Sequence, residues 1–284
     1  MAHLTQNNFM RKLFLLPFLI LTIGLLQAQT WYYPLPEGKK EFKINEQAGI
    51  KIRYAYQIVE GVKVPVNIIE YGNKGLPAVM YEKGIDENGD SVTTDEKVYK
   101  YNSNLAIEKI TSSSGYDEGD NSVTSFSYDS KGRLIKKEIA DIDPPVYYYK
   151  YDAKGRLSSV NYFNVMPETD DKGEYTGKTF ERPVALYTYK YDEKNRLISE
   201  FTYEPDSKQT ADDILYKIEW KYDSQNRIIQ ITEVNSGGDS ETLITRLEYN
   251  KQDLLSKLTR ITPDGEEDVY VYEYCTTCKQ SWMQ

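Results

Sequence analysis

The chain has 284 residues, a formal net charge of −9 at pH 7 and a single histidine, His3. Nucleic acids demand a basic protein surface for their phosphates, so the acidic balance excludes them as partners. Because His3 falls in a segment that we expect to be removed, histidine triads, histidine-ligated metals and histidine general bases are excluded together.

The first 28 residues are predicted to be a signal peptide. Arg11 and Lys12 precede an apolar run, residues 13–26, that is too short for a comfortable membrane span, and Ala28 is a small residue suited to cleavage. An uncleaved anchor is the alternative. No cysteine stands at the cleavage point to be lipidated. Cleavage near Ala28 would take the net charge to −11 and predicts a periplasmic or secreted protein without a membrane span.

Residues 29–48 are expected to be an N-terminal segment that covers an edge of the following sheet. Trp31, Tyr32 and Tyr33 supply apolar rings for this contact. An uncovered edge strand would invite pairing with other chains. Residues 49–284 are then a single domain of β-hairpin repeats.

Seven short strands end in a tyrosine that leads into a polar turn, and a second strand follows each turn. The turn tyrosines are Tyr71, Tyr101, Tyr128, Tyr151, Tyr191, Tyr222 and Tyr249. An Asp or Asn after the tyrosine can bond the backbone two residues on, and the last turn position needs a positive φ. The residues predicted to adopt it are Gly75, Asn104, Gly132, Gly155, Asn195, Asn226 and Asp253.

These hairpins predict an all-β fold with about 14 to 16 antiparallel strands. Neighbouring hairpins must stack to bury a shared face, so they form one large curled sheet, either open or closed into a barrel. The tight turns keep a nearly constant length, and the variation falls in the returns between hairpins. The longest return, Asn164 to Pro183, is the candidate functional loop.

The strands alternate cleanly between aromatic and charged residues. Tyr147, Tyr149 and Tyr151 share one face, for example, while Lys150 lies on the other. Many tyrosine hydroxyls need a partner or water, so the aromatic face is either a shared core or a binding platform. As candidate ligand-binding residues we take Tyr149, Tyr189, Trp220 and Tyr272. A membrane barrel with its aromatic side inward is disfavoured, because it would turn four lysines toward lipid, namely Lys100, Lys150, Lys190 and Lys221. The alternative is a membrane barrel with its aromatic side outward, which would have a polar interior and a band of tyrosines outside, as a porin requires.

Two cysteines remain, Cys275 and Cys278, near the C-terminus. Such a pair can be a redox motif, half of a metal site or a local disulfide. A second cysteine pair that could complete a metal site is missing, and in an exported chain we favour a disulfide that pins the last strand. Pairing with another chain and thiol redox chemistry are the alternatives. We predict no metal and no cofactor.

The turns Tyr128-Asp-Ser-Lys-Gly-Arg-Leu, Tyr151-Asp-Ala-Lys-Gly-Arg-Leu and Tyr191-Asp-Glu-Lys-Asn-Arg-Leu resemble the repeats of the Rhs or YD-repeat family. The resemblance covers roughly residues 65–260. It implies a β-sheet shell of strand-turn-strand repeats at a bacterial surface, with roles in adhesion, carbohydrate contact or interbacterial competition. This chain resembles a short exported member without a toxin domain, because only a short tail follows Tyr274.

The functional hypothesis is an exported, non-catalytic binding or scaffold protein of the bacterial envelope. It would contact a glycan or a surface protein through the aromatic face or the long loops. One alternative is a glycoside hydrolase or lyase that uses carboxylates, for which no catalytic residue can be named. The other is an orphan component of a polymorphic toxin system.

Overall fold

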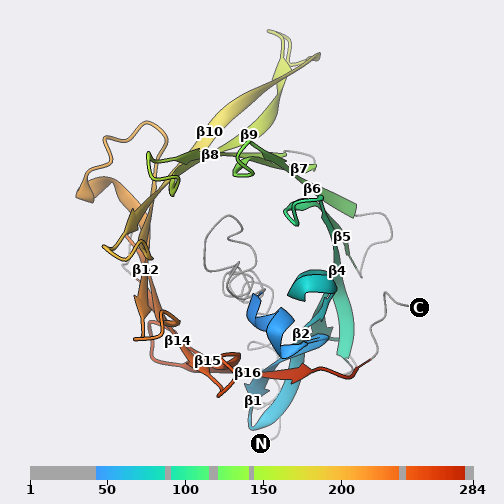
Figure 1. The fold of residues 1–284 in the computed structure, drawn as a ribbon. Coiled ribbons are helices and arrows are strands. Elements are labelled where there is room, and N and C mark those ends of the chain that lie inside the picture. The colour runs from blue at the N-terminus through green and yellow to red at the C-terminus, as the bar shows by residue number, and fades with distance from the viewer. Residues whose placement is uncertain (1–42, 87–90, 115–120, 141–143, 237–240, 279–284) are drawn as a thin grey trace, which may run out of the picture.

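A computed structural model describes residues 43–86, 91–114, 121–140, 144–236 and 241–278. In these residues sixteen antiparallel strands form one closed barrel (Figure 1). Each strand pairs with its neighbours along the chain, and the first strand also pairs with the last. The predicted all-β antiparallel class is confirmed, and of its two forms the closed one is observed.

The strands and short 3-10 helices follow one another with little else between them. In chain order they are β1 (Ile52–Val59), β2 (Val62–Tyr71), η1 (Asn73–Gly75), β3 (Pro77–Ile85), β4 (Ser91–Tyr101), β5 (Ile107–Ser114), β6 (Asn121–Tyr128), β7 (Leu134–Ala140), β8 (Pro145–Tyr151), β9 (Leu157–Thr169), β10 (Tyr175–Tyr191), β11 (Leu197–Tyr203), η2 (Ala211–Asp213), β12 (Ile214–Tyr222), β13 (Ile228–Asn235), β14 (Glu241–Tyr249), β15 (Leu255–Ile261) and β16 (Glu267–Cys275).

Ring closure corrects the expectation for residues 29–48. Because β1 lies between β2 and β16, the open edge that this segment was to cover does not exist. Residues 29–42, like the predicted signal peptide, lie outside the described residues. Residues 43–48 form a short helix inside the barrel (Figure 1). Its side chains Ile44 and Ala48 pack against Tyr71 and Met80.

The turn chemistry follows the prediction closely. Asp152 Oδ1 accepts the backbone N–H of Lys154 at 2.9 Å and that of Arg156 at 2.8 Å. Gly155 adopts φ +77°, a left-handed conformation that glycine reaches without steric cost. One predicted position was wrong: the positive φ near Tyr101 belongs to Leu105, at φ 60°, and not to Asn104. This turn therefore has the same length as the others.

Each of the seven tight turns contains a bulge, and tyrosine hydroxyls bond successive hairpins to one another. The ladder shifts register at all seven turn tyrosines, for instance between Lys190 and Tyr191. From Tyr101 onward the ring reaches back over the preceding hairpin, so that Tyr191 donates to the backbone carbonyl of Leu157 at 3.0 Å. The other such pairs are Tyr101–Pro77, Tyr128–Ile107, Tyr151–Leu134, Tyr222–Leu197, Tyr249–Ile228 and Tyr274–Leu255. These bonds satisfy hydroxyls that an aromatic core would otherwise leave without partners.

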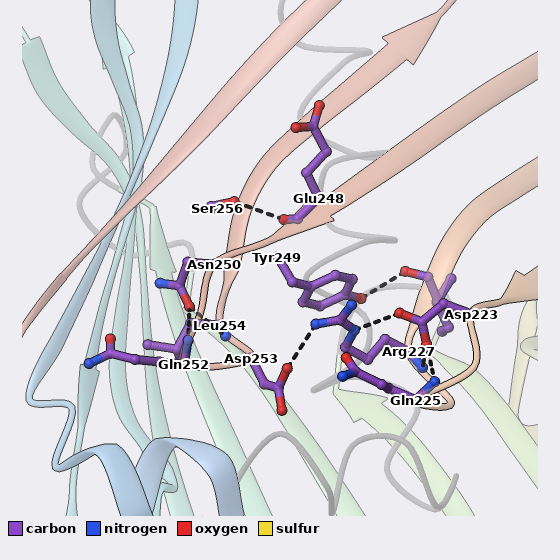
Figure 2. A network of polar contacts seen from close by, with 11 residues as sticks. Asp223, Gln225, Arg227, Glu248, Tyr249, Asn250, Gln252, Asp253, Leu254 and Ser256 are labelled. Atoms are coloured by element: carbon purple, nitrogen blue, oxygen red, sulfur yellow. Dashed lines mark hydrogen bonds and ion pairs between the residues drawn. The ribbon is translucent and has the colours of Figure 1, made fainter.

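Arginines link successive turns along the same rim. Arg227 pairs with Asp223 of its own turn at 2.6 Å and with Asp253 of the next turn at 2.8 Å (Figure 2). Its guanidinium lies 5.0 Å from the ring centroid of Tyr249, whose hydroxyl bonds Ile228. Arg227 therefore joins two hairpins by charge, ring stacking and hydrogen bonds, and Arg156 and Arg196 bond an asparagine of the next turn in the same way.

The helix at residues 43–48 and the strand register together show which side chains point into the barrel and which point outward. Ile69 and Met80 contact the residues 43–50 region inside the ring, so they point inward. Alternation along each strand and pairing between strands then place the turn tyrosines and their i−2 neighbours on the same inner face. The outer face carries the lysines of the four aromatic strands, and Lys100, Lys150, Lys190 and Lys221 are all exposed.

A tyrosine wall and a projecting arm

The four predicted ligand-binding residues all lie on the inner face, but they do not form one group. Tyr149, Tyr189 and Trp220 belong to one cluster, whereas Tyr272 packs with Ala55 and Leu258 in another. Trp220 and Tyr272 are only 9% and 8% exposed. These two rings are part of the core, while Tyr149 and Tyr189 keep partial exposure.

Tyr149 and Tyr189 lie in a larger array that we name the tyrosine wall. It spans the inner face of three adjacent strands and consists of Tyr147, Tyr149 and Tyr151 on β8, Tyr162 on β9, and Tyr187, Tyr189 and Tyr191 on β10. All seven rings are half-buried. Tyr147 and Tyr162 are cross-strand partners whose rings stack with centroids 4.8 Å apart and 10° between their planes.

Burial keeps the phenols of Tyr147, Tyr149 and Tyr187 protonated at neutral pH. Burial and the neighbouring Tyr162 raise the pKa of Tyr147 to about 12. Burial also raises the pKa of Tyr149 and of Tyr187, with smaller contributions from adjacent tyrosines. Each hydroxyl can therefore donate as well as accept a hydrogen bond, and each ring offers an uncharged face for stacking.

One lysine borders the wall. Lys137 on β7 is the cross-strand partner of Tyr147, and its Nζ lies 4.7 Å from the centroid of that ring. Burial lowers the pKa of its amine. Sequence alternation does not indicate this residue, because simple alternation from Leu134 would turn Lys137 outward. The bulge after Tyr128 inserts Ile135 without a partner and so reverses the facing of every later residue of β7.

The predicted functional loop, Asn164 to Pro183, is not a loop but an extension of two strands. The outer ends of β9 and β10 continue past the sheet as a two-stranded ribbon, residues 166–183, which we name the arm (Figure 1). Residues 167–183 are all exposed, including Tyr175 at 61% and Phe180 at 51%. At its root Tyr148 donates to Glu181 at 2.5 Å, and this bond, more than burial, raises the pKa of Tyr148 to about 12.

One side of the arm continues the tyrosine wall. On the barrel side of the bulge at residues 183–185, Tyr162 pairs with Ala185 on the inner face. On the arm side of this bulge, Asn164 pairs with Arg182 and Met166 with Phe180. Alternation along β9 keeps Tyr162, Asn164 and Met166 on one side. A single surface therefore runs from the wall onto the arm, with Arg182 and Phe180 at its exposed end.

A separate polar group lies on the inner face across β11 to β16. Glu200 and Glu233 are the cross-strand neighbours of Ile218 on either side, and both are buried. Tyr216 donates a hydrogen bond to Glu233, which adds to the effect of burial in raising the tyrosine pKa. These carboxylates are the buried acids that a hydrolytic site would need, but their pairing with Tyr216 also fits a packing role.

The two cysteines are joined. A disulfide links Cys275 and Cys278, and the backbone N–H of Cys278 also approaches the Cys275 sulfur at 3.1 Å. Cys275 pairs with Ile52 at the seam where β16 meets β1. The bond therefore fixes the chain directly beside the seam, as predicted for the last strand.

Comparisons with known proteins bear on the fold alone. No family model and no curated protein matches the chain. A porin-like protein from Bacteroides uniformis is similar in structure, with a TM-score of 0.50, 9% identity, and coverage of 80% of this chain and 98% of that one. A crystal structure of TcdB2-TccC3-Cdc42 aligns with 76% of this chain but only 15% of its own, at 12% identity and a TM-score of 0.21.

Two kinds of feature are absent from the part of the chain that the structure describes. No helix among them is long and apolar enough to cross a membrane. Within the same part of the chain, no group of three or more His, Cys, Asp or Glu side chains is arranged to hold a metal ion.

Proposed function

We propose that this chain is an exported, non-enzymatic binding protein of the bacterial envelope that holds a glycan against its tyrosine wall. The observation that carries the proposal is the wall itself. Seven tyrosines on three adjacent strands are only half-buried, and all lie on one face. A packed core would bury these rings fully, as it does Trp220 and Tyr272.

The chemistry of the wall suits saccharides. Sugar rings present flat C–H faces that pack on aromatic rings, and their hydroxyls need donors and acceptors nearby. Protonated phenols at Tyr147, Tyr149 and Tyr187 supply both. The surface also extends onto the arm as far as Phe180, which gives it the length for several sugar units.

Three observations support a location in the bacterial envelope. The first 28 residues have the pattern of a signal peptide. The barrel is similar to a protein described as porin-like, and exposed lysines on the outer face favour an aqueous surrounding. The tyrosine-led turns also support the proposal that the chain is a short Rhs or YD-repeat protein without a toxin domain.

The test uses residues 29–284 on a panel of bacterial envelope polysaccharides, with calorimetry on each positive. Tyr149→Leu should weaken binding about tenfold, since it removes one stacking face and one hydroxyl. Tyr148→Leu is the matched control, because this neighbour lies on the outer face of the same strand. Absence of any bound glycan, or equal binding by wild type and Tyr149→Leu, would contradict the proposal.

A second candidate function is docking of a protein through the arm. Beyond Val165 on β9, whose N–H still bonds the Pro144 carbonyl, and beyond Leu186 on β10, no ladder pairing of the described residues reaches outside the ribbon, so both of its outer edges are open. Such edges accept an added strand. Replacing residues 168–178 by the turn of residues 152–156 keeps Phe180 and Arg182 paired with β9. This variant should abolish capture of a partner from an envelope fraction while leaving glycan binding at the wall intact.

A further inference from the structure

Lys137 is the single charged side chain in a wide sector of the inner face. Within the described residues of β5 to β8, and of β9 as far as Met166, register and alternation place only apolar, aromatic, serine, threonine and asparagine side chains on that face beside it. Its two cross-strand neighbours are the rings of Phe126 and Tyr147. In this part of the structure the amine therefore lies among rings, and the first acid on the same side is Glu168, out on the arm.

Two other inner-face cations lie beside acids. Lys97 lies 2.5 Å from Glu82 and 3.0 Å from Asp95. Arg260 is the cross-strand partner of Asp268. An amine that contacts only a ring face recovers part of the cost of leaving water, whereas a carboxylate would recover much more. Lys137 is therefore suited to binding an anion from outside the chain, because no internal acid pairs with it among the described residues.

A second cation lies on the same surface. Arg182 follows Tyr162 and Asn164 along the side of the ribbon that continues the wall, and it is exposed. Two positive groups thus border a run of tyrosines, in a chain whose net charge is −9. Local positive charge on an acidic protein selects for anionic ligands at that place.

We propose that the saccharide bound by the tyrosine wall is acidic and that Lys137 binds a carboxylate carried on its sugar ring. The inference rests on the proposed function and adds to it the ligand class, a uronate-type saccharide that packs on the tyrosine wall beside Tyr147 while its carboxylate meets the Lys137 ammonium. Arg182 binds a further carboxylate where the chain leaves the wall. A planar carboxylate suits both partners, because each offers N–H donors at the edge of an aromatic surface.

The experiment compares two probes on the intact chain, residues 29–284. Tetragalacturonate carries one carboxylate per ring, and its methyl ester has the same sugar rings without charge. Calorimetry measures affinity, and NMR of the lysine side chains follows the titration of the Lys137 amine. Two variants are matched: Lys137→Met removes the inner cation, and Lys136→Met removes its outer neighbour, which pairs with Glu138 at 2.9 Å.

Tetragalacturonate should bind the wild type about 10- to 100-fold more tightly than the ester, the range of a charge-assisted hydrogen bond. Lys137→Met should erase this preference and Lys136→Met should keep it. Binding should also raise the titration midpoint of the Lys137 amine in the wild type. That readout needs no variant, so it holds even if Lys137→Met folds poorly.

Four outcomes would overturn the inference, and they separate it from the proposed function. Equal affinity for both probes, or a preference that survives in Lys137→Met, removes the role of Lys137 while glycan binding stands. Binding of neutral polysaccharides with none of tetragalacturonate has the same meaning. If no saccharide of either charge binds, both the inference and the proposed function fail.

Discussion

Two turns of the molecule have almost the same backbone but opposite surroundings. One joins β8 to β9 on the barrel rim, from Tyr151 to Arg156, and the other forms the tip of the arm, from Thr169 to Glu174. In the rim turn Asp152 Oδ1 accepts the N–H groups of the residues two and four ahead, at 2.9 and 2.8 Å. Asp170 does the same in the arm turn, at 2.9 and 3.0 Å. A glycine with φ near +80° completes each turn.

The difference lies in the flanking residues. Tyr151 bonds the carbonyl of Leu134 in the previous hairpin, and Arg156 stacks on Tyr191 and bonds Asn195 in the next one. The arm turn has a threonine and a glutamate at these places. An Asp and a glycine are therefore enough to make the turn, whereas the tyrosine and the arginine join it to its neighbours. The rim turns therefore stabilise the barrel, whereas the arm turn makes no such contacts with neighbouring hairpins.

The largest test of this contrast is truncation of the residue that follows each turn. Leu157 after the rim turn is 4% exposed, and Tyr175 after the arm turn is 61% exposed. Leu157→Ala should lower the free energy of unfolding by about 2 to 4 kcal/mol, because it leaves a cavity in the core. Tyr175→Ala should change it by less than about 0.5 kcal/mol. Urea unfolding of both variants measures the difference, and equal values would refute the division into rim and arm.

Removal of the turn carboxylates should have a smaller effect with the same asymmetry. Asp152→Ala loses two backbone hydrogen bonds and the pair with Arg156, and we expect it to cost about 1 to 2 kcal/mol. Asp170→Ala loses the same backbone bonds at the arm tip. It should free the amides of the arm for hydrogen exchange without lowering the global stability. A comparable fall in urea midpoint for both variants would mean that the arm unfolds together with the barrel.

Deleting one hydroxyl probes the links between hairpins alone. Tyr191→Phe keeps the ring under Arg156 but loses the bond to the Leu157 carbonyl. It should cost about 1 kcal/mol, the usual net contribution of a hydrogen bond whose acceptor is left buried. Tyr175→Phe, with its exposed ring on the arm, should have no measurable effect. Thermal unfolding of the pair is the measurement, and a silent Tyr191→Phe would show that water replaces the lost hydroxyl.

Much of the fold could be predicted because each turn depends on residues that are close together in the sequence. The turn positions Gly132, Gly155, Asn195, Asn226 and Asp253 all adopt the positive φ that their residue types allow. Closure into a barrel could not be predicted, since it depends on how far sixteen strands curl and on pairing between Ile52 and Cys275, which are far apart in sequence. The error at Asn104 arose from aligning that turn one residue short, where Leu105 carries the strained φ.

The site was harder to predict than the fold. Alternation placed Tyr149 and Tyr189 on the correct face, but burial of Trp220 and Tyr272 depends on which strands the barrel brings opposite them. Lys137 was missed because the bulge at Ile135 reverses its facing. The importance of residues 164–183 was visible in their length. Their form as a two-stranded ribbon could not be predicted, because their polar residues are equally typical of a loop.

The smallest effect concerns acid. Hydrogen bonds from the Arg133 and Arg156 backbone, with their guanidinium groups adding to the effect, lower the pKa of Asp129 and Asp152 below the ordinary value of 3.8. A lowered folded pKa means that the contribution to stability is complete above the unfolded value and is lost as the pH falls through the folded value. The stability of the barrel should therefore decline below about pH 4. The double variant Asp129→Asn, Asp152→Asn keeps an oxygen acceptor in each turn, as Asn102 and Asn250 do in theirs, but cannot titrate. Its unfolding midpoint should start lower and fall less steeply between pH 5 and 2 in a series of thermal scans, and a parallel decline of both proteins would place the acid sensitivity elsewhere in the chain.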